Sequence, residues 1–392
     1  MNLKTLTKNI RVLAERGFGI QKYPTAHKNA HILRLLANGA AYYLNRDGRA
    51  RPPVSVFIHV NNHCNLKCRF CDYGLQNRDS MFFQNLAGGH AANMPIEDFK
   101  RIVDEVKGFT PFVSIPATEP LLYGPLPEAI AYIRRNGLHC SINTNAVTLE
   151  KRAEDLVEAG LTKIVVSVDG PKDVHDLVRG VPGVFEKVVA GVNRLAEVKR
   201  AKGVDHPDIY INYVIGDQNY ATLEDCVASL PMEAIRQVDF RVMFYCTEDL
   251  AARHNAVFGD KYHATEACLS DTADLASIDT DLLWDQVHRL TARTEGKCKF
   301  FFRHGRRDLH TYFNEPGTFL DDTRCVVAWF AMQISTDGTL APLQRCYHNT
   351  FGNILERGFE GCWNGPEYRA FRQDLQRNGR FTACARCEGV NF

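Results

Sequence analysis

The sequence predicts an α/β protein built on a partial (β/α)6 barrel similar to a TIM barrel. From Val54 to about residue 245, short runs of β-branched and apolar residues recur, and amphipathic stretches with helical spacing separate them. Strands separated by helices must run parallel, and right-handed crossovers curve such a sheet toward a barrel. Functional residues are therefore expected at the carboxyl ends of the strands.

The chain divides into four segments. Residues 1–52 show helical spacing and end at a proline pair, which predicts a helical N-terminal extension. The barrel is assigned to residues 53–245. Residues 246–320 are less regular and are expected to link the domains or cover a substrate. Residues 321–392 predict a small α+β domain with short strands and five cysteines.

Six strands and five helices are predicted within the barrel. The strands are expected at Val54–Val60, Phe112–Ile115, His139–Asn143, Lys163–Val168, Ile209–Ile215 and Val238–Phe244. The helices between them are expected near Ile96–Val106, Leu126–Asn136, Leu149–Ala159, Val184–Lys199 and Leu223–Leu230.

Composition excludes several classes of protein. The chain has 47 basic and 46 acidic residues, so no global field attracts nucleic acid. No apolar run approaches the roughly 18 residues that cross a bilayer, and the N-terminus lacks the apolar core of a secretory signal. Thirteen cysteines in a chain of this size indicate metal binding or catalysis in a reducing, cytoplasmic environment.

Three cysteines follow the first predicted strand. Cys64, Cys68 and Cys71 have C-x3-C-x2-C spacing. Three thiolates from one loop can hold three irons of a [4Fe–4S] cube and leave the fourth iron open for another ligand. A zinc loop, with His59 or His63 as a further ligand, is the alternative interpretation, which would make the chain a non-catalytic zinc-binding protein.

This motif, with Phe70 just before its last cysteine, resembles the radical S-adenosylmethionine (radical SAM) superfamily. The resemblance implies that the cluster binds S-adenosylmethionine and reduces it, giving a 5′-deoxyadenosyl radical that abstracts hydrogen from a C–H bond. An electron donor such as flavodoxin or ferredoxin is then an expected partner.

Further segments resemble the same family and imply cofactor contacts. Ala117–Pro120 takes the place of a Gly-Gly-Glu-Pro motif, which retains Glu119 but loses both glycines. Ser141–Ala146 brings Asn143 or Asn145 to the cofactor edge. The segment VVSVDGPKDVHDLVRG suggests that Ser167 and Arg179 meet the methionine carboxylate.

The C-terminal cysteines resemble the SPASM domain of that superfamily and its shorter twitch form. The resemblance implies an auxiliary [4Fe–4S] cluster for electron transfer, with Cys362 left over as a buried thiol. The expected ligands of this second cluster are Cys325, Cys346, Cys384 and Cys387.

The substrate is less determined. Cys246 follows the sixth strand and is a candidate hydrogen donor to a substrate radical, and the adjacent Tyr245 is a second candidate catalytic residue. A basic stretch from Lys297 to Arg307 indicates an anionic partner. A small biosynthetic substrate that is oxidised or epimerised is the favoured interpretation, because the helical N-terminus differs from the usual peptide-recognition module. Modification of a peptide or protein stays open as an alternative.

Overall fold

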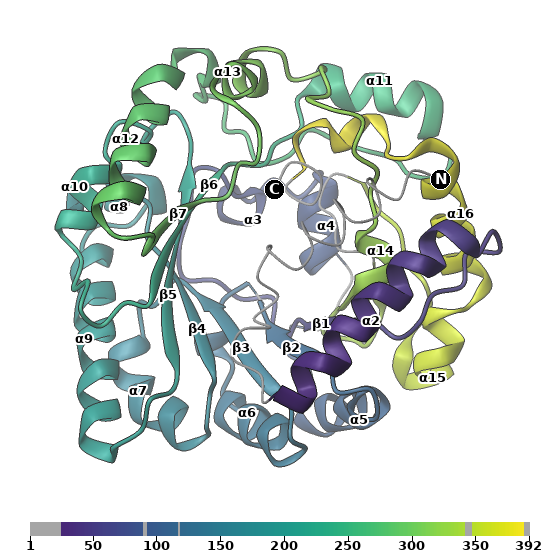
Figure 1. The fold of residues 1–392 in the computed structure, drawn as a ribbon, viewed down its shortest axis with the longest axis horizontal. Coiled ribbons are helices and arrows are strands. Elements are labelled where there is room, and N and C mark those ends of the chain that lie inside the picture. Colours follow the sequence, from purple (N-terminus) through teal and green to yellow (C-terminus); the bar gives the residue numbers. More distant parts are fainter. Residues whose placement is uncertain (1–24, 89–91, 117, 342–346, 388–392) are drawn as a thin grey trace.

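The computed structural model describes residues 25–88, 92–116, 118–341 and 347–387, and the side chains from residue 31 onward within these ranges. Its centre is a curved sheet of nine strands in the order β7-β6-β5-β4-β3-β2-β1-β8-β9 (Figure 1). Neighbouring strands are parallel except for β8 and β9. The strands are β1 (Ser55–Ile58), β2 (Phe112–Ile115), β3 (His139–Thr144), β4 (Lys163–Ser167), β5 (Asp208–Ile215), β6 (Gln237–Val242), β7 (Cys298–Phe300), β8 (Ala331–Ile334) and β9 (Leu340–Ala341).

Helices line the outer face of the barrel (Figure 1). The helices of the barrel are α5 (Ile96–Lys107), α6 (Leu126–Arg135), α7 (Leu149–Glu158), α8 (Lys172–Arg179), α9 (Val184–Lys202) and α10 (Leu223–Ala228). Helix α5 shows why they form, since its apolar residues Phe99, Ile102, Val103 and Val106 all lie on one buried face.

The remaining described helices come before, between and after the barrel repeats. They are α2 (Thr25–Leu44), α3 (Asp72–Leu75), α4 (Met81–Ala87), α11 (Glu248–Phe258), α12 (Thr280–Arg293), α13 (Arg306–Asn314), α14 (Val327–Phe330), α15 (Ile354–Trp363) and α16 (Pro366–Asn378). Short 3-10 helices lie at η2 (Pro120–Leu122), η3 (Leu275–Ser277) and η4 (Thr382–Arg386). No described helix is long and apolar enough to cross a membrane.

The two faces of the sheet differ in chemistry. Along β4 and β5, fully buried aliphatic residues alternate with half-buried ones. The aliphatic residues, such as Ile164, Val166 and Ile211, pack under the outer helices. The alternate positions include Lys163, Ser167, Tyr210 and Asn212, and they face the interior of the barrel.

The C-terminal segment is joined to the barrel sheet. Strand β8 pairs in parallel with β1 from Ser55 opposite Ala331 to Ile58 opposite Ile334. The N-terminal helix α2 closes this side, because the Tyr42 ring meets Trp329 edge-on at 4.8 Å. The six predicted strands and five predicted helices are confirmed, but the sheet extends through β7, β8 and β9 beyond the six strands expected.

Candidate functional site

The three-cysteine loop lies at the carboxyl end of β1 and leads into α3. It is held against the end of α8 by backbone hydrogen bonds, in which Lys67 N–H donates to the Arg179 carbonyl at 3.2 Å and Arg69 N–H to the Val178 carbonyl at 3.0 Å. Gly180 follows with φ 70°, and a Cβ there would lie 2.3 Å from the Lys67 carbonyl oxygen. The loop therefore depends on a glycine about 110 positions away in the chain, since only glycine allows both this φ and this approach.

The thiols of this loop face polar donors. Arg179 Nη1 lies 3.7 Å from Cys68 Sγ, and Asn145 Nδ2 lies 3.8 Å from Cys64 Sγ. Burial raises the pKa of the Cys64 thiol to about 12 and also raises the pKa of Cys68. Iron bound here would replace the thiol protons, and the two donors would then stabilise the thiolates.

The residues present fit a cubane cluster. Cys64, Cys68 and Cys71 come from one loop and are near enough to repel one another as thiolates. Among the described residues, no three potential ligands stand close enough to share a single metal ion. In a cubane, each cysteine binds a different iron. The three thiols can therefore lie farther apart than the ligands of a single metal ion.

Beneath the loop lies a buried ion pair. Arg179 Nη2 is 2.5 Å from Asp169 Oδ2, and both side chains are almost fully buried. Asp169 Oδ1 also accepts a hydrogen bond from Val214 N–H at 2.9 Å. The pair fixes the guanidinium between the end of β5 and Cys68, so Arg179 is already engaged by protein groups on two sides.

Glu119 is buried, and both of its carboxylate oxygens accept hydrogen bonds. Its Oε1 accepts from the Thr144 hydroxyl at 2.6 Å and from Leu121 N–H at 3.0 Å, and its Oε2 accepts from Asn145 N–H at 2.7 Å. Burial raises the pKa of this carboxyl to about 7, although the three hydrogen bonds oppose the shift. The carboxylate thus positions the backbone of residues 144–145 beside Cys64, and only 1% of Glu119 is exposed for direct contact with a cofactor.

The other sequence-predicted contacts lie along neighbouring strand ends. Asn145 is buried, and its amide donates to the Asn65 side chain at 2.8 Å. Asn143 is exposed on the inner face of β3, and Ser167 is half-buried at the end of β4. The structure therefore brings Asn145 and Arg179 to the cluster loop and leaves Asn143 and Ser167 facing the barrel interior.

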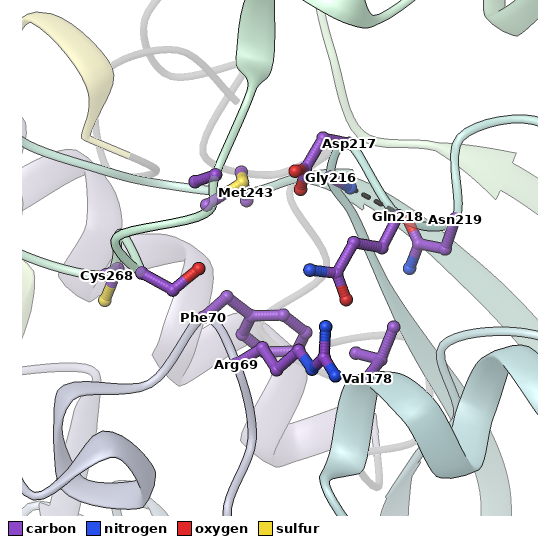
Figure 2. Close-up of a pocket in the computed structure, with 11 residues that line it drawn as sticks. Arg69, Phe70, Val178, Gly216, Asp217, Gln218, Asn219, Met243 and Cys268 are labelled. Atoms are coloured by element: carbon purple, nitrogen blue, oxygen red, sulfur yellow. Dashed lines mark hydrogen bonds between the residues drawn. The ribbon is translucent and has the colours of Figure 1, made fainter.

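A pocket opens beside the cluster loop. Figure 2 shows the Phe70 ring and the Gln218 amide on facing sides of it, with Val178 and Met243 as apolar walls. Gly216, which follows β5, donates its N–H to the Asn219 side chain at 2.8 Å. The pocket offers an aromatic face, apolar contacts and amide groups, and the charged residues Arg69 and Asp217 also line it.

Tyr245 and Cys246 do not line this pocket. Both are fully buried, and the Tyr245 hydroxyl donates to the Tyr312 carbonyl at 2.6 Å. Cys246 Sγ lies 3.7 Å from the Thr247 carbonyl oxygen. Tyr245 instead lines a second pocket together with Glu266 and Phe313. Neither residue is part of the site proposed below.

Two functional positions were missed in the sequence. Asp169 was not among the predicted site residues, although its carboxylate holds Arg179. Asp72 directly follows the third cysteine, and its two carboxylate oxygens each accept from Cys268 N–H at 3.2 Å. Burial raises the pKa of Asp72 to about 6. The only signal in the sequence was an acid immediately after the motif.

The C-terminal cysteines also converge. Burial raises the pKa of Cys384. The nearby Cys387 and Cys325 raise it further, so these three cysteines lie near one another. Cys346 lies outside the described residues. Cys362 is buried in α15, where its charged neighbours are Arg357 and three glutamates, Glu105, Glu356 and Glu367.

The basic stretch of residues 297–307 is paired in part. Arg303 forms an ion pair with Asp321 at 2.9 Å, and Arg306 pairs with Asp281 and Asp285. Lys299 is exposed on β7. Two of the five Lys and Arg side chains therefore form ion pairs that join elements of the fold.

Known protein families match the two regions of the chain that contain the cysteine groups. The radical SAM superfamily model matches residues 58–230, and the model for the iron-sulfur cluster-binding domain SPASM matches residues 325–388. Fe-coproporphyrin III synthase of Methanosarcina barkeri is 28% identical over 367 residues, which cover 89% of this chain and 84% of that protein. Pre-heme d1 synthase of Dinoroseobacter shibae is 23% identical over 354 residues, which cover 87% of this chain and 81% of that protein.

Solved structures share the fold. Streptococcus suis SuiB bound to S-adenosylmethionine aligns with a TM-score of 0.58 at 18% identity, over 94% of this chain and 78% of that chain. SuiB bound to precursor peptide SuiA aligns with a TM-score of 0.56 at 17% identity, over 92% of this chain and 76% of that chain. The family models and this shared architecture agree with the site geometry: the chain belongs to the radical SAM superfamily and carries a C-terminal SPASM domain, and the two domains imply [4Fe–4S] clusters.

Proposed function

We propose that this protein is a radical SAM enzyme that modifies a tetrapyrrole by abstracting hydrogen from one of its C–H bonds. The observation that carries the proposal is the loop of Cys64, Cys68 and Cys71 beside the pocket of Phe70 and Gln218. The tetrapyrrole class is supported by similarity over most of the chain to proteins named as coproporphyrin and heme d1 synthases. Modification of a peptide rests on similarity of fold alone and is not proposed.

The chain's own residues define how the cofactors would be held. The three thiolates would bind three irons of the first cluster, and the open iron would take the methionine end of S-adenosylmethionine. When bound, this pair supplies the electron and the carbon radical for hydrogen abstraction. The pocket wall formed by Phe70, Val178 and Met243 would hold the adenine ring, with Gln218 at its polar edge.

The buried residues around the loop keep this arrangement in place. Arg179 and Asn145 would donate to the cluster thiolates, which offsets part of their negative charge. Asp169 holds Arg179, and Glu119 holds the backbone of Asn145. Ser167 and Asn143 are proposed to face the cofactor or the substrate from the barrel interior.

The C-terminal cluster is proposed to transfer an electron. Cys325, Cys384 and Cys387 converge in the structure and, with Cys346, would supply four protein ligands. Such a cluster has no open iron for a substrate, which favours an oxidation in which the substrate radical gives up an electron. Flavodoxin or ferredoxin is the proposed external electron donor.

Two sets of variants test the proposal. Replacing Cys64, Cys68 and Cys71 with Ala should abolish the formation of 5′-deoxyadenosine from S-adenosylmethionine under reducing conditions. Replacing Cys384 and Cys387 with Ala should retain uncoupled cleavage but block product formation. Full cleavage activity in the first variant would overturn the assignment of the radical cluster.

A further inference from the structure

Charged residues lie on the inner face of the sheet, away from the cluster loop. This group, named here the lumen cluster, comprises Lys163 on β4, Tyr210 on β5, Asp239 and Arg241 on β6, and Phe301 after β7. Lys163 begins β4, whereas Ser167, on the same face, ends it beside the cofactor region. Lys163 therefore starts deeper along the inner face than Ser167, whereas Asp239 is level with Ser167 through the register of β4, β5 and β6.

Lys163 has an aromatic partner. Its Nζ lies 3.8 Å from the centroid of the Tyr210 ring. Within the described part of the chain, the ammonium has no hydrogen-bond acceptor at bonding distance. Burial lowers its pKa to about 8, and the charge of Asp239 opposes this shift. A half-buried ammonium without an acceptor has unused hydrogen-bonding capacity for a ligand.

The neighbouring strand adds a second cation. Asp239 is 7% exposed, and its carboxylate accepts from the Gln237 amide and lies 3.8 Å from Arg241 Nη2. The Arg241 guanidinium carbon is 4.3 Å from the centroid of the Phe301 ring. One carboxylate thus lies among two cations that both rest on aromatic rings.

Further charged residues lie near this group, and cations outnumber carboxylates among them. Lys299 is exposed and lies opposite Asp239 in the β6–β7 register. Asp208 lies opposite Lys163 in the β4–β5 register. His139 lies on the same face of β3, two positions before Ser141, which is opposite Lys163. Arg236 forms a hydrogen bond with the Tyr210 side chain. Four cations and two carboxylates therefore share this part of the barrel, and an anion of the substrate would complete the balance.

We propose that the lumen cluster binds a carboxylate of the substrate, with the Lys163 ammonium as its main partner and Arg241 beside it. The inference rests on the proposed function, because it assigns the anionic end of a tetrapyrrole to the inner face of the sheet. The ammonium supplies a mobile point charge, and the guanidinium supplies a planar pair of donors. The opposite end of the substrate would then face the strand ends, where Ser167 and Asn143 lie.

Equilibrium dialysis with coproporphyrin III tests this assignment on the reconstituted holoprotein, because the fluorescence of the free porphyrin reports its concentration. Loss of a hydrogen bond to a charged group predicts that Lys163→Met weakens binding by about 10-fold to 100-fold. Lys187→Met is the matched control, since Lys187 is exposed on the outer helix α9. It should bind like the wild-type protein.

The pH dependence gives a second readout. The wild-type affinity should fall as the pH rises through about 8, because the ammonium loses its proton. Lys163→Arg should retain its affinity at pH 9, since arginine stays charged. Equal binding by Lys163→Met and the wild type, or no binding by the wild type, would overturn the proposed subsite. Formation of 5′-deoxyadenosine by the wild-type protein is measured separately, and its absence would contradict the proposed function itself.

Discussion

At the scale of single residues, the cluster loop depends on polar groups that do not touch iron. Arg179 and Asn145 reach the thiols of Cys68 and Cys64. Each is itself fixed by a buried acid, Asp169 for the first and Glu119 for the second. These acids are therefore positioning residues, and their loss should disturb the loop before it disturbs any chemistry.

Glu119 gives the clearest test of this role. Its pKa is raised from 4.5 to about 7 in the folded protein, so the folded state binds more protons than the unfolded state between these values. Stability contributed by this group is therefore lost as the pH rises through that window. We expect thermal unfolding to show the stability difference between the wild type and Glu119→Gln shrinking as the pH rises from about 4.5 to about 7.

Glu119→Gln should also destabilise the folded state. An amide nitrogen facing Asn145 N–H would place two donors together, with an expected cost of about 1 to 3 kcal/mol. Glu128→Gln is the control, because Glu128 is a largely exposed surface acid. A pH-independent difference between the wild type and Glu119→Gln would contradict the assigned cause.

At the scale of elements, most strands and helices of the barrel could be predicted from the sequence, but some of its short elements could not. The aliphatic runs from Lys163 and Ile209 were long enough to identify β4 and β5 almost to the residue. Helix α8 was missed because Asp169-Gly170-Pro171 is turn chemistry and the helix after it is short. Strand β7 was missed because three residues carry too little alternation to be recognised.

The contact between α8 and the cluster loop leads to a prediction about Gly180. Gly180→Ala and Gly183→Ala both place alanine at a positive φ, which costs about 1 kcal/mol in each case. Only at Gly180 would the new Cβ meet backbone, at 2.3 Å from the Lys67 carbonyl oxygen, whereas nothing lies within 4 Å at Gly183.

Iron content after reconstitution should therefore separate the two variants. We expect Gly180→Ala to lose iron from the first cluster while Gly183→Ala retains the wild-type content. Equal iron content in both variants would show that the loop does not depend on this contact.

At the scale of the whole molecule, the C-terminal segment packs against the start of the barrel. Strand β8 of the C-terminal segment pairs with β1, the strand that leads into the cluster loop. Helix α2 packs beside α14, and Trp363 Nε1 donates to the Arg51 carbonyl at 2.9 Å. In Figure 1 helices α2 and α16 accordingly lie on the same side of the barrel. The two cysteine groups are thus connected through one continuous sheet.

The sequence could identify both cysteine groups but not this connection. The spacing C-x3-C-x2-C is local, so it is visible without any structure. Pairing between β1 and β8 joins residues about 275 positions apart, and β8 is only four residues long. Register over such a separation depends on tertiary packing, which a single sequence does not reveal. For the same reason the ion pairs that Arg303 and Arg306 of the basic stretch form with Asp321 and Asp285 could not be predicted.

The central claim is that one open cluster and one fully ligated cluster share this chain. The most direct measurement is the iron, sulfide and zinc content of the anaerobically reconstituted protein, with electron paramagnetic resonance of the reduced protein before and after S-adenosylmethionine is added. Two cubanes predict about eight irons with matching sulfide, no zinc, and a change in the signal of only one cluster. Bound zinc without iron would contradict the account. So would two clusters whose signals both stay unchanged when S-adenosylmethionine is added.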